Sequence, residues 1–159
     1  MRKRFDWEGF KSEISGIRFE DGKEFVASRS KDYYWYSPIL DEIFRDKIGD
    51  LVVIPSNQEQ VQKVAAAIAK YKIPLTLRGG GTGNYGQCVP LKGGVIMIMT
   101  KLNRIIGFKE KSVLTESGVR ISRLDDAARN IGLELLMYPS TRRTATIGGF
   151  LAGGSGGCG

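Results

Sequence analysis

The stretch Pro74-Leu-Thr-Leu-Arg-Gly-Gly-Gly-Thr-Gly-Asn-Tyr-Gly-Gln87 decides how the rest of the chain is interpreted. The apolar run 73–77 predicts a strand that ends at Arg78, and five glycines follow: Gly79, Gly80, Gly81, Gly83 and Gly86. Because glycine has no Cβ and tolerates positive φ, such a loop can fold tightly and bring its backbone N–H groups close to a ligand. Consecutive N–H groups that point into one concavity bind anions. With Thr82 and Asn84 as hydrogen-bonding side chains and the positive charge of Arg78 beside the loop, this stretch predicts a phosphate or pyrophosphate site.

Two other nucleotide-binding loops fit the spacing poorly. Gly81-x-Gly83-x-x-Gly86 matches the letters of the Rossmann dinucleotide fingerprint, which needs a helix inside the glycines and an acidic residue about 20 positions later. Here Gln87-Cys-Val-Pro90 follows, which does not begin a helix, and position 106 is isoleucine. A P-loop ends in Gly-Lys-Ser/Thr, which this loop lacks. A glycine loop that only turns the chain remains open as an alternative.

A second glycine-rich segment, Thr146-Ile-Gly-Gly-Phe-Leu-Ala-Gly-Gly-Ser-Gly-Gly-Cys-Gly159, ends the sequence. Thr146 is a candidate N-cap for a short helix that begins at Ile147, with Phe150 and Leu151 on its apolar face. A flexible linker is the alternative, but linkers rarely interleave apolar side chains so regularly. Two glycine-rich segments, one after a strand and one opening a helix, suit a long ligand that is held at two places.

The two motifs together, Arg78-Gly-Gly-Gly-Thr-Gly-Asn84 and Pro139-Ser-Thr-Arg-Arg-Thr-Ala-Thr-Ile-Gly-Gly149, resemble the FAD-binding domain of the vanillyl-alcohol-oxidase / p-cresol-methylhydroxylase (PCMH) type. Within this type, the sequence resembles the FAD-linked oxidases and dehydrogenases of 2-hydroxy acids, such as D-lactate dehydrogenase and the flavin subunit of glycolate oxidase. The resemblance covers roughly residues 50–159. It implies an α+β fold of two subdomains that is not a Rossmann fold, with the pyrophosphate under the first glycine loop and the flavin along the second glycine segment.

The resemblance also implies which residues bind the cofactor. These residues are Arg78, Gly79, Gly80, Gly81, Thr82, Gly83, Asn84, Gly86, Gln87, Ser140, Thr146, Ile147, Gly148, Gly149, Gly153, Gly154, Ser155, Gly156 and Gly157. Arg142 and Arg143 are candidates for binding a substrate carboxylate, although most arginines are solvated or structural. We name no catalytic residue, because we expect the family's catalytic residues to lie outside this sequence.

The chain contains no histidine. This removes the commonest general acid or base, the commonest metal ligand and the Ser/His and Cys/His triads. Some relatives carry the flavin covalently on a histidine near the first loop or on a cysteine in the second segment. Cys88 and Cys158 do not match those places, so the resemblance implies non-covalent FAD. The two cysteines also lack metal-ligand spacing, which predicts no metal site, reduced thiols and a cytoplasmic protein.

The net charge of +7 raises the question of nucleic-acid binding. Basic residues are scattered, often beside acidic ones, and no DNA-recognition pattern is present. A surplus of Lys and Arg is usually a solvated surface, and an FAD site also benefits from positive potential near the pyrophosphate. No apolar run approaches the ~20 residues that span a bilayer. We therefore expect a small 2-hydroxy acid and an unidentified electron acceptor as partners, with no nucleic acid and no transmembrane segment.

Residues 1–49 predict an N-terminal extension, and residues 50–159 predict the FAD-binding domain. In the extension we expect a strand at 25–28, packing aromatics in Asp32–Pro38 and a helix at 40–48. Hydrophobic periodicity then predicts strands at 51–54, 95–99, 104–108 and 113–116, a helix from a capping box at Ser56 and a helix at 120–131 that Gly132 ends. This order predicts a small parallel sheet within residues 50–100 and a mixed sheet in the remainder.

These features predict an FAD-dependent oxidoreductase that oxidises a 2-hydroxy acid by hydride transfer to the flavin, in which the protein binds and orients the cofactor. The alternative is a non-catalytic binding module derived from such a domain. The sequence ends inside a glycine-rich loop, which predicts a truncated chain whose end no strand or helix fastens. We expect the 159 residues to have no turnover by themselves, because they supply neither a substrate pocket nor a base.

Overall fold

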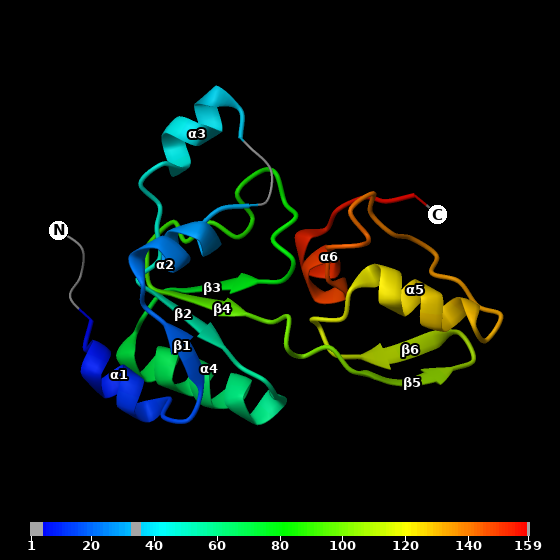
Figure 1. Cartoon of the computed structure of the whole chain (residues 1–159), viewed down its shortest axis with the longest axis horizontal. Helices are drawn as coiled ribbons and strands as arrows, with labels where there is room; N and C mark the ends of the chain where they lie inside the picture. The colour runs from blue at the N-terminus through cyan, green and yellow to red at the C-terminus, as the bar shows by residue number, and fades with distance from the viewer. Residues whose placement is uncertain (1–4, 33–35, 159) are drawn as a thin grey trace.

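A computed structural model describes residues 5–32 and 36–158, and Figure 1 shows its elements in two groups. The first group is built on a four-stranded sheet. Its strands are β1 (Arg18–Glu20), β2 (Leu51–Ile54), β3 (Leu75–Arg78) and β4 (Val95–Ile98), in the spatial order β1-β2-β4-β3. Strands β2, β4 and β3 are parallel, whereas β1 is antiparallel to β2. The predicted parallel sheet is therefore present, and the N-terminal 49 residues add one strand to it.

Helices cover both faces of this sheet. They are α1 (Trp7–Glu13), α2 (Lys23–Arg29) and α4 (Gln58–Tyr71). Because successive strand side chains point to opposite faces, Leu51 and Val53 pack in one apolar cluster with α1 and α4. Val52 packs on the opposite face with Ile96 and with Val26 of α2. Figure 1 shows α1 and α4 on one side of the sheet and α2 on the other.

Helix α4 begins one residue later than the capping-box pattern predicts. Asn57, not Ser56, is the N-cap, and its side chain accepts a 2.8 Å hydrogen bond from the backbone N–H of Gln60. The side chain of Gln60 in turn accepts from the backbone N–H of Ser56 at 2.7 Å. The helix ends at Tyr71, and the C-cap residue Lys72 is left-handed with φ 53°. Ala65, which the periodicity places on the buried face, is exposed.

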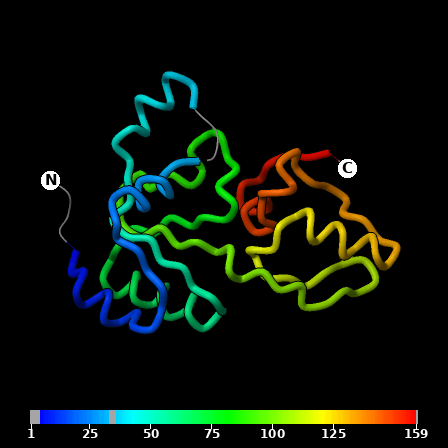
Figure 2. Tube along the Cα trace, viewed as in Figure 1, coloured from blue at the N-terminus to red at the C-terminus, as the bar shows by residue number. Residues whose placement is uncertain are grey.

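The second group contains a hairpin and two helices: β5 (Ile105–Lys109), β6 (Ser112–Thr115), α5 (Ile121–Arg129) and α6 (Ile147–Gly153). Among the described residues, the second sheet consists of β5 and β6 alone, and they are antiparallel. Gly132 follows the end of α5 with φ 76°, as the sequence predicts, but Ile131 is exposed rather than buried. Figure 2 shows that the chain passes from the first group to the second after β4 and returns toward the first through α6.

In the N-terminal 49 residues one predicted element is wrong and another is present with different bounds. Residues 25–28 lie in helix α2, because Val26 fills the apolar cluster on the sheet from a helical backbone. The predicted helix at 40–48 is α3 (Pro38–Phe44), which starts earlier because Ser37 caps it and Pro38 occupies its first turn. The predicted boundary between residues 49 and 50 stays a prediction, although α1, β1 and α2 all pack on the sheet of the first group.

The predicted aromatic cluster lies in part outside the described residues, which exclude 33–35. Its fourth member, Tyr36, is buried and packs edge-to-face on Phe44 of α3, with ring centroids 5.2 Å apart. The hydroxyl of Tyr36 accepts a 2.8 Å hydrogen bond from the backbone N–H of Asp32. Tyr36 therefore has the packing role that the sequence predicts.

The last described residues are fastened to the fold. The backbone N–H of Tyr138 donates to the carbonyl of Cys158 at 3.0 Å, and the N–H of Cys158 donates back at 2.9 Å. As predicted, no strand or helix holds this part of the described chain, but an isolated bridge to Tyr138, 20 residues earlier, does. Within residues 5–32 and 36–158, no helix has the length and apolar character that crossing a membrane requires.

Candidate FAD-binding site

A cleft of about 1150 Å³ lies between the two groups of elements, and both glycine-rich segments line it. One wall consists of strand β3 and the loop that follows it, through Val89. The other wall consists of helix α6 and residues 139–156 around it. Figure 1 shows the loop after β3 facing α6. Two segments that are about 70 residues apart in the sequence therefore form a single site, as expected for a ligand held at two places.

The two glycine-rich segments touch each other at the first glycines. A Cβ at Gly79 would overlap the side-chain oxygen of Thr146, and a Cβ at Gly80 would overlap the backbone carbonyl of Thr144. A Cβ at Gly149 would lie 4.0 Å from the Cα of Gly79. At Gly79 and Gly80 only a residue without a side chain permits this approach, whereas the distance from Gly149 is an ordinary van der Waals contact. These glycines therefore have a packing role in addition to any contact with a ligand.

Arg78 lies beneath the glycine loop rather than beside a ligand. Its side chain is buried, and its Nη1 donates to the carbonyls of Arg29 (3.1 Å) and Lys31 and to the sulfur of Cys88 (3.0 Å). A Cβ at Gly81, where φ is 67°, would overlap the Arg78 guanidinium. The charge therefore lies beside the loop, as the sequence predicts, on a buried side chain that does not line the cleft.

The first part of the loop carries the free hydrogen-bond donors. The backbone N–H groups of residues 79–84 donate to no residue within the described part of the chain. The next N–H group, that of Tyr85, donates to the side-chain oxygen of Gln87 at 3.1 Å. Thr82 and Asn84 line the cleft together with these glycines. This run of unused N–H groups is available to a ligand, and the anion nest that the sequence predicts there stays a prediction.

The second segment opens helix α6 as the sequence predicts. Thr146 is the N-cap, and its hydroxyl accepts from the backbone N–H of Gly149 at 3.3 Å. The N–H groups of Ile147 and Gly148 donate to the carbonyls of Val119 and Ser117, both at 2.9 Å. A Cβ at Gly148 would approach the Ser117 Cβ to 2.6 Å. The start of α6 is therefore held by hydrogen bonds against residues 117–119, which precede α5.

Most of the predicted binding residues line the cleft. Those that do are Gly79, Gly80, Gly81, Thr82, Gly83, Asn84, Gln87, Thr146, Gly148, Gly149, Gly153, Ser155 and Gly156. Six others do not: Arg78, Gly86, Ser140, Ile147, Gly154 and Gly157. Several of these six have a local structural role, since Gly154 ends α6 with φ 60° and a Cβ at Gly157 would meet the Tyr138 carbonyl at 2.6 Å. The predicted set as a whole remains a prediction for FAD contacts.

Several lining residues are not among those that the sequence predicts to bind the cofactor. They are Leu75, Thr76, Leu77, Tyr85, Cys88, Val89, Met99, Ser117, Pro139, Thr141, Ala145, Phe150 and Ala152. The first three belong to strand β3, which is at the edge of the sheet, so Leu77 is 55% exposed. Most of the others are apolar or small residues, whose place in a cleft depends on packing between the two groups. The apolar half-exposed edge strand is the one signal that sequence periodicity could have provided.

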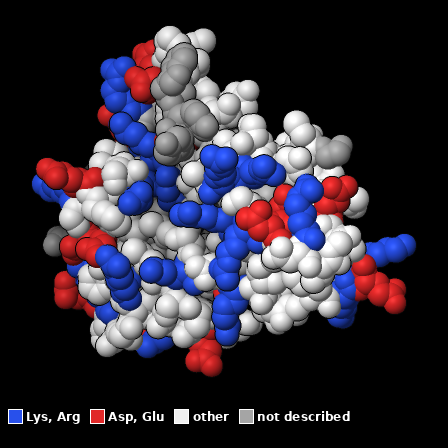
Figure 3. All heavy atoms as spheres, turned by 45° about the vertical axis from the view of Figure 1, so that its right-hand side comes forward, with Lys and Arg blue, Asp and Glu red and all other residues white. Residues whose placement is uncertain are grey.

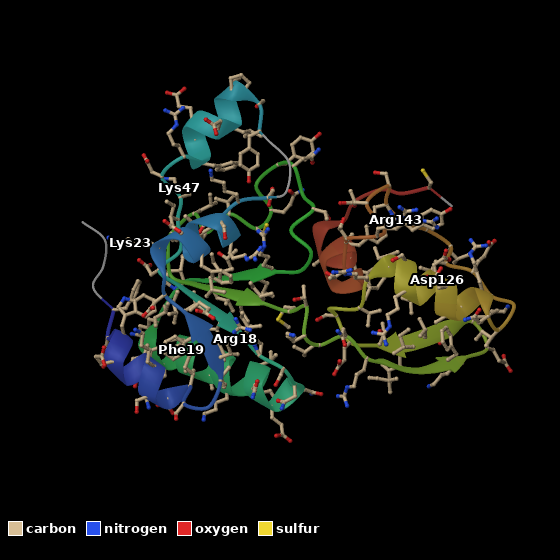
Figure 4. All side chains as sticks on the ribbon, viewed as in Figure 1. Arg18, Phe19, Lys23, Lys47, Asp126 and Arg143 are labelled. Atoms are coloured by element: carbon tan, nitrogen blue, oxygen red, sulfur yellow. The ribbon has the colours of Figure 1, made fainter. Side chains whose placement is uncertain are left out.

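The two arginines considered for a substrate carboxylate lie elsewhere. Arg142 Nη1 donates to Asp125 Oδ2 at 3.3 Å, and its guanidinium stacks on Tyr138 with 5.2 Å to the ring centroid. Arg143 is exposed and does not line the cleft, and Figure 4 labels it near α6 and α5. Figure 3 shows Lys and Arg side chains along the middle of one face, with acidic groups also present on it. The contacts with Asp125 and Tyr138 give Arg142 a structural role, in which it holds the segment before α6.

The thiol of Cys88 is chemically protected. Burial is the main cause that raises its pKa to about 12, and its hydrogen bond to Asp32 raises it further, against the lowering effect of Arg78. A thiolate is the reactive form of cysteine. Cys158, by contrast, is exposed.

We expect folded protein at pH 8 to react with iodoacetamide at Cys158 only, and denatured protein to react at both cysteines, as mass spectrometry of the peptides would measure. Because the pKa of Cys88 is higher in the folded state than in an unfolded chain (about 8.5), its contribution to stability is complete below pH ~8.5 and is lost as the pH rises toward 12. Equal alkylation of both residues in the folded protein would contradict the burial of Cys88.

Comparison with known proteins gives the family. Residues 49–159 match the model of a family described as an FAD binding domain. The chain is 35% identical over 141 residues to a D-lactate dehydrogenase of Archaeoglobus fulgidus, a match that covers 88% of this chain and 28% of that protein. It is 31% identical over 109 residues to the glycolate oxidase subunit GlcD of Escherichia coli, covering 67% of this chain and 22% of the relative. The chain thus spans about a quarter of the length of these curated relatives.

Solved structures show the same fold. An alkyldihydroxyacetonephosphate synthase aligns with 96% of this chain and 33% of its own at a TM-score of 0.80 and 21% identity. A p-cresol methylhydroxylase aligns with 91% of this chain and 28% of its own at a TM-score of 0.72 and 19% identity. The predicted α+β fold of the PCMH type, distinct from a Rossmann fold, is confirmed.

The chain belongs to the FAD-binding domain family of FAD-linked oxidoreductases that includes D-lactate dehydrogenase and glycolate oxidase relatives. Its cofactor is FAD, as the sequence predicts. The cleft suits this group for two reasons. Residues 79–84 present unused N–H donors for a pyrophosphate, and the cleft of about 1150 Å³ that they line has space for a large ligand. No cluster of metal-ligating side chains occurs in the described part of the chain.

Proposed function

We propose that this chain is the flavin-binding part of an oxidoreductase that oxidises a small 2-hydroxy acid such as D-lactate or glycolate. One observation carries the proposal: two distant glycine-rich segments line a single cleft, and the first presents unused N–H groups at 79–84. The names of the two curated relatives, D-lactate dehydrogenase and glycolate oxidase, support the substrate class. The electron acceptor is a separate, unidentified partner, and we place the protein in the cytoplasm with reduced thiols.

The residues of this chain bind and orient the cofactor in this proposal. The N–H groups of residues 79–84 hold the pyrophosphate, and Gln87 holds the loop through the Tyr85 N–H. Gly149, Gly153 and Ser155 lie along the opposite wall, where the absence of bulky side chains allows a flat ring to approach. Bound FAD supplies the hydride acceptor. We also propose that the FAD is non-covalent, since the chain has no histidine and Cys88 is buried and protonated.

We expect protein purified from its full reading frame to show the absorbance of oxidised flavin, and acid to release that flavin as FAD. Addition of D-lactate, L-lactate, glycolate and longer 2-hydroxy acids under anaerobic conditions should bleach the flavin with at least one of them, as recorded by spectrophotometry. Free FAD with the same acids is the control.

Each step of this experiment tests a separate part of the proposal. A colourless folded protein that takes up no added FAD would favour a non-catalytic binding module. Flavin that stays with the polypeptide on a denaturing gel would contradict non-covalent binding. A bound flavin that none of these acids reduces would contradict the substrate class and leave the FAD site intact.

A further inference from the structure

We propose that Asp32 is a positioning residue that fills one half of the glycine loop with the protein's own carboxylate and leaves the other half for the pyrophosphate. This inference rests on the proposed function, because it concerns how the same loop holds FAD. Asp32 lies in the N-terminal segment between α2 and α3, outside residues 49–159 that match the FAD-binding family. No motif in the sequence indicates a role for it.

The carboxylate of Asp32 accepts hydrogen bonds from the second half of the loop, which we define as residues 85–88. Its side chain is 6% exposed. Its Oδ2 accepts from the backbone N–H of Gly86 at 2.7 Å. Its Oδ1 accepts from the backbone N–H of Cys88 at 3.3 Å and from the Cys88 thiol at 2.6 Å. A carboxylate that accepts several N–H bonds in one concavity is an anion in a nest.

The occupied half determines where a second anion can bind. The N–H groups of Tyr85, Gly86 and Cys88 already donate to Gln87 and Asp32. A pyrophosphate placed there would lose these donors and lie against a buried negative charge, which repels it. The N–H groups of residues 79–84 have no such partner among the residues that the structure describes. In this proposal FAD therefore binds the first N–H groups of the loop, and the Asp32 carboxylate, whose Oδ2 lies 3.2 Å from where a Cβ at Gly83 would be, disfavours an anion from Gly83 onward.

Arg78 also helps to hold the glycine loop in place. Its guanidinium donates to the carbonyls of Arg29 and Lys31, the residues just before Asp32, and to the Cys88 sulfur. It also lies where a Cβ at Gly81 would be. Residues 29–32 are thus attached to the start of the loop through Arg78 and to its end through Asp32. The buried carboxylate and the buried guanidinium share Cys88 as a common contact, which keeps opposite charges close together.

Asp32→Asn tests this role with little change in shape. The amide keeps one acceptor oxygen and turns an N–H₂ donor toward an N–H donor, so at least one bond to Gly86 or Cys88 is lost. We expect the dissociation constant for FAD to rise about 10–100-fold, the effect of losing hydrogen bonds to a charged group. The measurement is FAD titration of the apoprotein by flavin fluorescence. The matched control is Asp126→Asn, an exposed aspartate on α5 that Figure 4 labels, for which affinity should not change.

Phosphorus NMR distinguishes positioning from a loss of stability. In Asp32→Asn at saturating FAD, we expect the pyrophosphate resonances to move toward those of free FAD, while Asp126→Asn keeps the wild-type resonances. Far-UV circular dichroism below the melting temperature should be the same for all three proteins. Wild-type affinity or wild-type phosphorus resonances in Asp32→Asn would overturn the inference alone. A wild-type protein that binds no FAD would overturn it together with the proposed function.

Discussion

Gly81→Val should lose FAD binding while the rest of the first group keeps its fold. Gly81 has φ 67°, a conformation that β-branched residues rarely adopt, and holding such a residue there costs about 1–3 kcal/mol. The new side chain would also displace the Arg78 guanidinium, which lies where the Cβ must go. Because both effects act on the loop that presents the free N–H groups, we expect the FAD dissociation constant to rise by about a hundredfold or more. FAD released by acid after purification, quantified by chromatography, is the measurement.

A matched valine substitution serves as the control for this experiment. Gly107 lies in strand β5, outside the cleft, with open space around its Cα and no positive φ. Gly107→Val should therefore keep both the fold and the flavin. Both variants should give the same far-UV circular dichroism spectrum, because helix α4 does not line the cleft and should stay intact. If Gly81→Val protein retains the wild-type amount of FAD, the assignment of the pyrophosphate to this loop is wrong.

Phe10→Ala should reduce the free energy of unfolding by about 3–5 kcal/mol, which is the usual cost of truncating a buried phenylalanine. Phe10 lies in α1, is fully buried, and packs edge-to-face on Trp7 and on Tyr71 of α4, with centroid distances of 6.0 and 6.2 Å. Since domains are stable by only about 5–15 kcal/mol, this loss would leave much of the chain close to unfolding. Urea unfolding followed by tryptophan fluorescence measures it.

The control for Phe10→Ala is an exposed leucine. Leu136 is 92% exposed, so Leu136→Ala should change the free energy of unfolding by no more than about 0.5 kcal/mol. A loss below about 1 kcal/mol in Phe10→Ala would mean that helix α1 contributes little to the fold, as an independent N-terminal extension would. A large loss would instead make residues 1–49 part of the FAD-binding domain.

Sequence patterns predicted the elements with a clear composition or period. The buried run Leu51–Ile54 is rich in β-branched residues and the helix that ends before Ile73 has a helical period, and both are present as β2 and α4. The run 25–28 fails because four apolar-rich residues fit a strand and a helical turn equally well, and packing of Val26 on the sheet decides. The cap of α4 was misplaced by one residue, because Ser56 and Asn57 are both good N-caps.

The site was predictable where glycine is required and unpredictable where side chains meet across the fold. Glycines such as Gly79 and Gly80 are recognisable because a side chain there would collide with the second segment. The burial of Arg78 and the contacts of Asp32 depend on which residues face the loop after folding. Asp32 forms its bonds with Gly86 across 54 residues, and no local pattern records a contact of that kind.

Such sequence separation also affects when the site can form. The bonds that hold the loop join residues 49 and 54 positions apart, Arg29 with Arg78 and Asp32 with Gly86. Contacts across so long a span require closure of a large chain loop before they contribute any stability, which makes them late events in folding. The N-terminal segment leaves the ribosome before the loop that it later supports. We therefore expect tight FAD binding to follow the docking of residues 29–32, since these residues hold the loop that presents the N–H groups.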